Sequence, residues 1–130
     1  MIVVDASALI AILDKEPDAA LYAEAIAEAD PPIISAATLL EVNIVMLNRY
    51  GAKAVRMVDR LIKEAGFQVE SFTGQQAELA REAYARYGKG QKSAGLNYGD
   101  CFSYALAKRP GCRYCSRGRI SQKPTSYRWK

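Results

Sequence analysis

Short apolar segments alternate with longer segments of helical periodicity, and this alternation is what most constrains the fold of the chain. Ile2–Val4 and the pair Ile33 and Ile34 are apolar runs of the kind that form buried strands. Residues 67–72 alternate Phe, Val and Phe with polar residues, which predicts a third strand. Strands that alternate with helices favour a parallel sheet with helices on both faces, so the predicted class is α/β.

The segments between these strands carry helix signals. Ser7 and Thr73 are suited to cap helices, whereas Gly51 and Gly66 are suited to end them. The predicted helices cover residues 8–13, 19–29, about 35–50, 52–65, 75–87 and 99–108. Residues 88–95, rich in Gly and Lys, are interpreted as a flexible basic loop.

Length and composition set the broad class. A chain of 130 residues is expected to form one domain with a substantial core. No apolar run approaches the roughly 18 residues needed to cross a bilayer, and the N-terminus lacks the basic residues that begin a signal peptide. Three cysteines, an odd number, fit a reducing compartment better than a disulfide scaffold. We therefore expect a cytoplasmic protein.

The net charge of +4 comes from one end of the chain. Residues 109–130 contain seven basic residues and no acidic ones, whereas residues 1–108 contain 11 basic and 14 acidic residues. The body is therefore mildly acidic and the tail strongly basic, a pattern that favours contact of the tail with nucleic acid.

Three acidic residues stand in apolar or small-residue surroundings. Asp5 ends an apolar run, Glu41 interrupts the largely apolar segment 35–47, and Asp100 begins a largely apolar helix. A buried carboxylate usually has a compensating partner, and ligands of parallel sheets bind beyond the carboxyl ends of strands, where Asp5 lies. Carboxylates are natural ligands of Mg²⁺ and Mn²⁺. The three acids therefore predict a divalent-cation site and metal-dependent chemistry on phosphates.

Each acid also fits a structural role, and other chemistries were weighed. Asp5 and Asp100 could cap helices, and Glu41 could extend to the surface. The sequence has no histidine, which excludes histidine-based ribonuclease chemistry, Ser-His-Asp hydrolysis and most catalytic zinc sites. A phosphatase with an aspartyl nucleophile is disfavoured, because Ser7 stands where such enzymes usually have a second acid.

Three motifs together resemble the PIN domain, and within it the VapC-type toxins of bacterial toxin–antitoxin operons. They are Ile-Val-Val-Asp-Ala-Ser-Ala-Leu at the start, Leu-Leu-Glu-Val around residue 41, and Leu-Asn-Tyr-Gly-Asp-Cys-Phe-Ser-Tyr-Ala-Leu-Ala at residues 96–107. The resemblance implies a three-layer α/β/α sandwich around a mainly parallel sheet and Mg²⁺- or Mn²⁺-dependent RNA endonuclease activity. It also implies homodimerisation and inhibition by a VapB-type antitoxin. Asp5, Glu41 and Asp100 match three acidic catalytic and metal-binding positions of the family, with Ser7 as a supporting hydrogen-bonder.

The chain departs from the family pattern after Lys108. Members normally continue with a buried strand, a Gly-x-Asp-Phe turn that carries a fourth acid, and a terminal Thr-Asp. Here no acid follows Asp100, and no strand is expected after Lys108. The predicted organisation is therefore a PIN-domain body over residues 1–108 and a basic tail over 109–130 that is atypical or disordered.

A shifted reading frame accounts for this departure. When the third base of each codon is read with the first two of the next, the codons of residues 112–126 permit Pro-Leu-Leu-Phe-Lys-Gly-Glu-Asp-Phe-Ala-Lys-Thr-Asp-Ile. This is the ending that the resemblance implies. The hypothesis is a one-base deletion near Lys108 and Arg109, and the alternative is a native basic tail that binds RNA.

Two functions follow from these observations. The leading interpretation is a VapC-type ribonuclease, which the three surviving acids favour. The alternative is a catalytically impaired PIN-scaffold protein that only binds its antitoxin or RNA, which the missing fourth acid favours. The RNA that is cut is left open, because RNA recognition depends on loop shape and basic contacts.

Overall fold

A five-stranded sheet forms the centre of the computed structural model, which describes residues 1–29, 31–88, 96–109 and 111–121. The strands are β1 (Ile2–Val4), β2 (Pro32–Ser35), β3 (Gln68–Glu70), β4 (Arg113–Ser116) and β5 (Arg119–Ile120). Their order is β3-β2-β1-β4-β5, with all neighbours parallel except the antiparallel pair β4 and β5. Val3 in the central strand pairs with Ile33 on one side and Tyr114 on the other.

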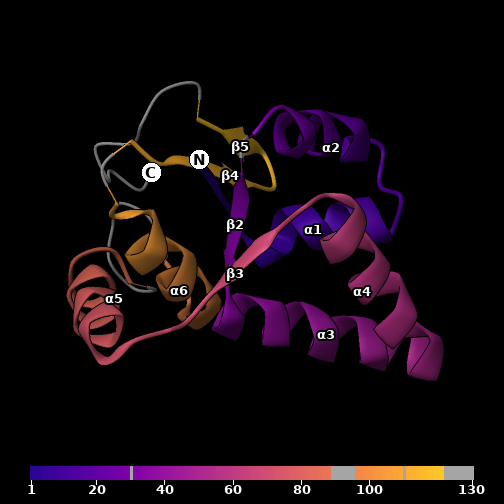
Figure 1. Ribbon diagram of the computed structural model, residues 1–130. Helices are drawn as coiled ribbons and strands as arrows, with labels where there is room; N and C mark the ends of the chain where they lie inside the picture. The colour runs from indigo at the N-terminus through magenta and orange to yellow at the C-terminus, as the bar shows by residue number, and fades with distance from the viewer. Residues whose placement is uncertain (30, 89–95, 110, 122–130) are drawn as a thin grey trace.

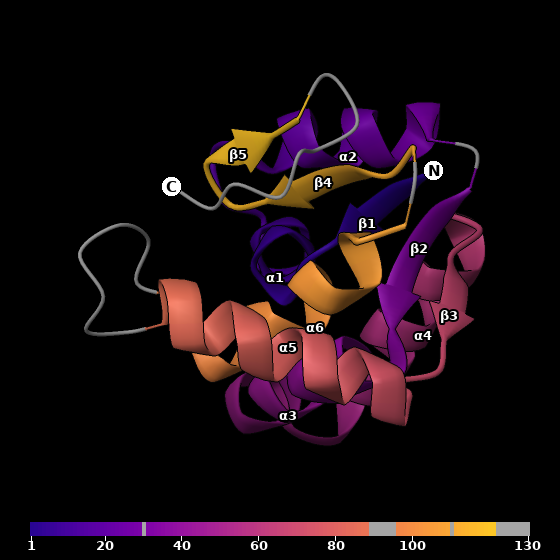
Figure 2. The same ribbon diagram turned by 90° about the vertical axis from the view of Figure 1, so that its left-hand side faces the viewer.

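Helices cover both faces of this sheet (Figures 1 and 2). They are α1 (Ala6–Leu13), α2 (Ala19–Glu28), α3 (Ala36–Tyr50), the 3₁₀ turn η1 (Gly51–Lys53), α4 (Ala54–Glu64), α5 (Gly74–Tyr87) and α6 (Tyr98–Ala107). Side chains alternate across a strand, so Ile2 and Val4 pack with α1 to α4, whereas Val3 packs with α6 on the opposite face. Helix α5 packs against the outer side of α6. The predicted three-layer α/β/α sandwich around a mainly parallel sheet is therefore confirmed.

The helices agree with the prediction to within a few residues. Of the two caps that the sequence offered for α1, Ser7 and Asp5, the structure has Asp5, whereas α6 is capped by Asn97 and not by Asp100. The strand expected over residues 67–72 is shorter, Gln68–Glu70, at the edge of the sheet. No helix in the described ranges is long and apolar enough to cross a membrane. Residues 89–95 of the predicted basic loop lie outside the described residues.

The structure corrects the prediction that no strand follows Lys108. Strand β4 pairs with all three residues of β1, and Cys112, Tyr114 and Cys115 are buried. The prediction failed because it looked for an aliphatic run, whereas two central buried positions, filled by Tyr114 and Cys115, complete this strand. The predicted boundary at residue 108 therefore does not mark the end of the sheet.

The packing of β4 yields a test with a matched pair of tyrosines. Tyr114 is 3% exposed in the core, whereas Tyr98 is 78% exposed. We expect Tyr114→Ala to lower the free energy of unfolding by about 3–5 kcal/mol, the usual loss for a buried aromatic residue. Tyr98→Ala should change it by about 1 kcal/mol or less, since it loses only partial ring contacts. Urea denaturation of both variants measures the difference, and equal losses would contradict a core role for β4.

Candidate active site

Asp5 lies at the carboxyl end of the central strand, where the chain turns into α1. Its side chain is 4% exposed, and Oδ2 accepts hydrogen bonds from the Ser7 N–H at 3.2 Å and from Ser7 Oγ at 2.8 Å. Its own N–H donates to the Cys115 carbonyl at 2.8 Å. Asp5 is thus the N-cap of α1 and a hydrogen-bonded partner of β4 at once.

A residue that the sequence reasoning missed, Ser103, completes the hydrogen bonding of Asp5. Ser103 is fully buried, and its Oγ donates to Asp5 Oδ1 at 2.7 Å. Thr38, also fully buried, places Oγ1 at 3.5 Å from Ser103 Oγ. The signal in the sequence was spacing: Ser103 follows Asp100 by three residues and therefore lies on the same face of α6.

Glu41 lies in α3 with its carboxylate against the backbone of Gly99. A Cβ added at Gly99 would be 2.6 Å from both Glu41 carboxylate oxygens, so a side chain at this position would displace the carboxylate. Glu41 Oε1 is buried without a hydrogen-bond partner among the described residues. Burial raises the pKa of Glu41 above its ordinary value of 4.5, and the charges of Asp5 and Asp100 raise it further.

Asp100 occupies the first turn of α6, as part of a capping box. Asn97 Oδ1 accepts from the Asp100 N–H at 2.9 Å, and Asp100 Oδ2 accepts from the Asn97 N–H at 3.0 Å. Burial raises the pKa of Asp100 above its ordinary 3.8, the hydrogen bond from Asn97 lowers it, and the charge of Asp5 raises it. Asp5, Glu41 and Asp100 therefore act on one another electrostatically, although they come from three separate elements.

The carboxylate oxygens of these three acids are ligands of the kind that Mg²⁺ and Mn²⁺ prefer. A cation would offset the raised pKa values of Glu41 and Asp100 and give the buried Glu41 Oε1 a partner. As the side chains are placed, however, no group of three or more His, Cys, Asp or Glu residues in the described ranges could hold a metal ion. The three carboxylates are chemically suited to a divalent cation. In this structure, the hydroxyls of Ser7 and Ser103 donate to the two Asp5 carboxylate oxygens.

The turn between β4 and β5 closes one side of this site. The Arg117 N–H donates to Ser7 Oγ at 2.9 Å, and the Arg117 guanidinium pairs with Glu16 at 2.7 Å. The Gly118 N–H donates to the Tyr22 hydroxyl at 2.6 Å. The segment after Lys108 therefore reaches the hydrogen-bond network of Asp5 through Ser7.

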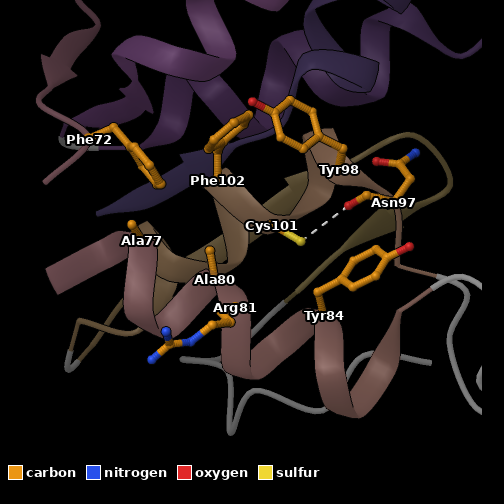
Figure 3. Close-up of a pocket in the computed structure, with 9 residues that line it drawn as sticks. All are labelled: Phe72, Ala77, Ala80, Arg81, Tyr84, Asn97, Tyr98, Cys101 and Phe102. Atoms are coloured by element: carbon orange, nitrogen blue, oxygen red, sulfur yellow. Dashed lines mark hydrogen bonds between the residues drawn. The ribbon is translucent and has the colours of Figure 1, made fainter. Parts of the chain in front are cut away.

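An aromatic pocket of about 640 Å³ lies between α5 and α6 (Figure 3). Phe72, Phe102 and Tyr98 form a row of edge-to-face rings, with centroids 4.8 Å and 4.9 Å apart. Tyr98 and Phe102 also line a second pocket of about 350 Å³, to which Glu41 contributes. Aromatic surface therefore extends from the pocket beside α5 to Glu41.

Comparison with known proteins agrees with this fold. The family model of the PIN domain matches residues 2–120, a range that includes β4 and β5. The chain therefore belongs to the PIN-domain family.

Within that family, the chain is similar to proteins named as VapC ribonucleases. VapC ribonuclease Mb0625 of Mycobacterium bovis and ribonuclease VapC28 of Mycobacterium tuberculosis are each 54% identical to it over 106 residues, which is 81% of this chain and 80% of theirs. Ribonuclease VapC of Mycolicibacterium smegmatis is 49% identical over 109 residues, 84% of each chain. The predicted relationship to VapC-type proteins is confirmed.

A solved structure shares the fold. VapC20 of Mycobacterium tuberculosis, described as a toxin that cleaves the sarcin–ricin loop, superposes with a TM-score of 0.64 and 22% sequence identity. The superposition covers 83% of this chain and 82% of that one.

The raised pKa of Glu41 predicts a pH-dependent effect on stability. The folded chain binds the Glu41 proton more tightly than the unfolded chain, so ionisation destabilises the fold as pH rises from about 4.5 through the folded pKa. We expect Glu41→Gln to melt at a higher temperature than wild type at pH 7 without divalent cations, with the difference shrinking near pH 4.

Melting curves across this pH range measure the effect, and Glu24→Gln on the exposed face of α2 is the control. If the melting temperature of Glu41→Gln differs from that of wild type by the same amount at every pH, the carboxylate charge is not the cause of the difference.

Proposed function

We propose that this chain is a Mg²⁺- or Mn²⁺-dependent RNA endonuclease and the toxin of a VapBC-type toxin–antitoxin pair. The observation that carries the proposal is that three acids from separate elements lie close enough for the charges of Asp5 and Asp100 to raise the pKa of Glu41, and for that of Asp5 to raise the pKa of Asp100. Its relatives are named as ribonucleases, which supports the proposed reaction. They match most of this chain, which supports assigning their activity to it.

Asp5, Glu41 and Asp100 would hold the metal. A bound divalent ion would activate a water and neutralise charge on the phosphate being cut. Ser7 and Ser103 hold opposite oxygens of Asp5, and Asn97 holds Asp100, so the carboxylates are oriented before substrate arrives.

Glu41 is a candidate to accept the proton of the attacking water, because its Oε1 has no hydrogen-bond partner among the described residues. The sequence contains no histidine that could take this role.

The aromatic surface beside the acids suits an RNA substrate. Bases stack on aromatic side chains irrespective of sequence, and Tyr98, two residues before Asp100, is 78% exposed. Arg81 lines the same pocket and offers a cation for the phosphate backbone.

The proposed protein partners are a VapB-type antitoxin and a second copy of the chain. Helix α3 exposes Leu40, Ile44 and Leu47 at 60%, 50% and 42%, which is apolar surface that a protein partner could cover. The three cysteines are all free thiols, which supports the proposed cytoplasmic location.

A second candidate function is a PIN scaffold that binds its partner or RNA without cutting. Two observations favour it: the described side chains, as placed, form no metal-binding group of three, and no acidic residue follows Asp100 in the sequence. A nuclease assay with Mn²⁺ separates the two candidates.

Asp100→Asn tests the ribonuclease directly. Asparagine keeps an oxygen that can accept from the Asn97 N–H, so the capping box and the fold should persist. Loss of a metal ligand should lower kcat/KM by at least about 100-fold, which corresponds to a few kcal/mol of transition-state stabilisation. Cleavage of RNA with Mn²⁺ measures the effect, with melting curves to confirm folding.

The matched control is Asp59→Asn, which removes an exposed carboxylate from α4. It should cleave as the wild type does. Cleavage that persists in excess EDTA would refute the metal dependence.

We further propose that the gene carries, or was read with, a one-base deletion near codon 108. In the shifted frame, the codons of Arg113–Ser116 permit Leu-Leu-Phe, and these are the residues that form β4. The next codons permit Gly-Glu-Asp-Phe after one lysine, over β5 and the turn where Arg117 contacts Ser7. The apolar residues of the shifted ending therefore fall on the buried strand β4, and its acidic residues fall near the turn that contacts Ser7.

Insertion of one base after codon 108 tests this proposal, together with resequencing of the gene. The repaired chain should be the more stable one, because Leu-Leu-Phe would place three large apolar side chains in β4, where the present chain has Tyr114 and the smaller Cys115 at the two central buried positions. It should also cleave RNA faster, because a fourth carboxylate would lie beside Ser7 and Asp5. Repaired and original chains that melt and cleave alike would show that the basic ending is native.

A further inference from the structure

A buried pair of hydroxyl groups joins the three elements that carry the acids. Ser103 on α6 donates to Asp5 Oδ1 at 2.7 Å, across 98 residues of sequence, and Thr38 on α3 lies 3.5 Å from Ser103. Both hydroxyl residues are fully buried. The hydrogen bonds therefore connect α3, α6 and the end of β1 inside the protein.

The positions of the two hydroxyls follow those of the acids. Thr38 precedes Glu41 by three residues on α3, and Ser103 follows Asp100 by three residues on α6. Residues three apart lie on the same face of a helix, one turn from each other. Each hydroxyl is therefore one helical turn from an acid, and the contact between Thr38 and Ser103 joins α3 and α6 one turn away from Glu41 and Asp100.

The chemistry of the groups fixes the direction of these hydrogen bonds. A hydroxyl has one proton to donate, and an ionised carboxylate only accepts. Ser103 gives its proton to Asp5 Oδ1, so its oxygen can only accept from Thr38. The direction is Thr38 to Ser103 to Asp5, and Thr38 supports the donor that holds the carboxylate.

We propose that Ser103, supported by Thr38, is a positioning residue that fixes the Asp5 carboxylate and the spacing of the three acids for metal binding. This inference rests on the proposed function, because it concerns the same site. A buried hydroxyl is unfavourable unless it is hydrogen-bonded, whereas alanine and valine would pack at these two positions without polar groups. The hydroxyls are therefore assigned to the buried Asp5 carboxylate, which they satisfy and orient, and not to the apolar packing of the core.

The experiment measures Mn²⁺ affinity by calorimetry, with a melting curve and the KM and kcat of RNA cleavage for each variant. Ser103→Ala removes the donor to Asp5 and should weaken Mn²⁺ binding by about 10–100-fold, the usual effect of removing a group that orients a metal ligand. Cleavage should require correspondingly more Mn²⁺, with an unchanged KM for RNA at saturating metal. Ser71→Ala, at an exposed position, is the control and should bind as wild type does.

Thr38 provides a pair of substitutions that separates positioning from packing. Thr38→Val keeps the shape and loses the hydroxyl, whereas Thr38→Ser keeps the hydroxyl and loses a methyl group. A positioning role predicts weaker Mn²⁺ binding for Thr38→Val and near wild-type binding for Thr38→Ser, although Thr38→Ser should be the less stable protein. This pair decides the question if Ser103→Ala does not fold.

The possible results are distinct. Wild-type Mn²⁺ affinity in folded Ser103→Ala, or equal affinity in the two Thr38 variants, overturns the positioning role and leaves the proposed ribonuclease intact. A wild-type chain that binds no Mn²⁺ overturns the metal site of the proposed function and this inference with it.

Discussion

The arrangement of the site depends on the burial of one carboxylate, that of Asp5. With 4% of its surface exposed, Asp5 retains few contacts with water, and three donors from Ser7 and Ser103 replace them. Without such donors a buried carboxylate is strongly unfavourable. The Asp5 N–H also binds the Cys115 carbonyl, so this residue links α1, α6 and β4. The end of the sheet where the acids meet is organised around these bonds.

The other two acids, Glu41 and Asp100, destabilise the folded chain when they are ionised. Burial and like charge raise the pKa of both Glu41 and Asp100, which means that their ionised forms are disfavoured in the folded chain. A sequence optimised for stability alone would not keep these two half-buried carboxylates. The close approach of Gly99 to the Glu41 carboxylate is a similar conflict, because a side chain at this position would displace the carboxylate, whereas alanine would favour the helix more. Such conflicts between stability and local chemistry are typical of functional sites.

The sequence predicted the elements better than the bonds between them. Periodicity and breakers located the helices within a few residues, and the apolar settings of Asp5, Glu41 and Asp100 identified candidate acids. Local rules also name several residues as equally good caps, so the choice of Asp5 over Ser7 and of Asn97 over Asp100 appeared only in three dimensions. The bond from Ser103 to Asp5 spans 98 residues, and no local pattern in one sequence encodes it.

Strand β4 shows why no strand was predicted after Lys108, and where the residues of this segment affect the site. It lies between β1 and β5 with Tyr114 facing one core and Cys115 the other, so its position demands burial at successive residues. Tyr-Cys and the shifted-frame Leu-Leu-Phe both meet that demand, because backbone pairing to β1 does not depend on the side chains. The two readings differ more in the turn beyond, where Arg117 now binds Ser7 through its N–H and Glu16 through its guanidinium. A carboxylate in that turn would add negative charge beside Asp5, so the choice between the readings changes the chemistry of the site more than the fold.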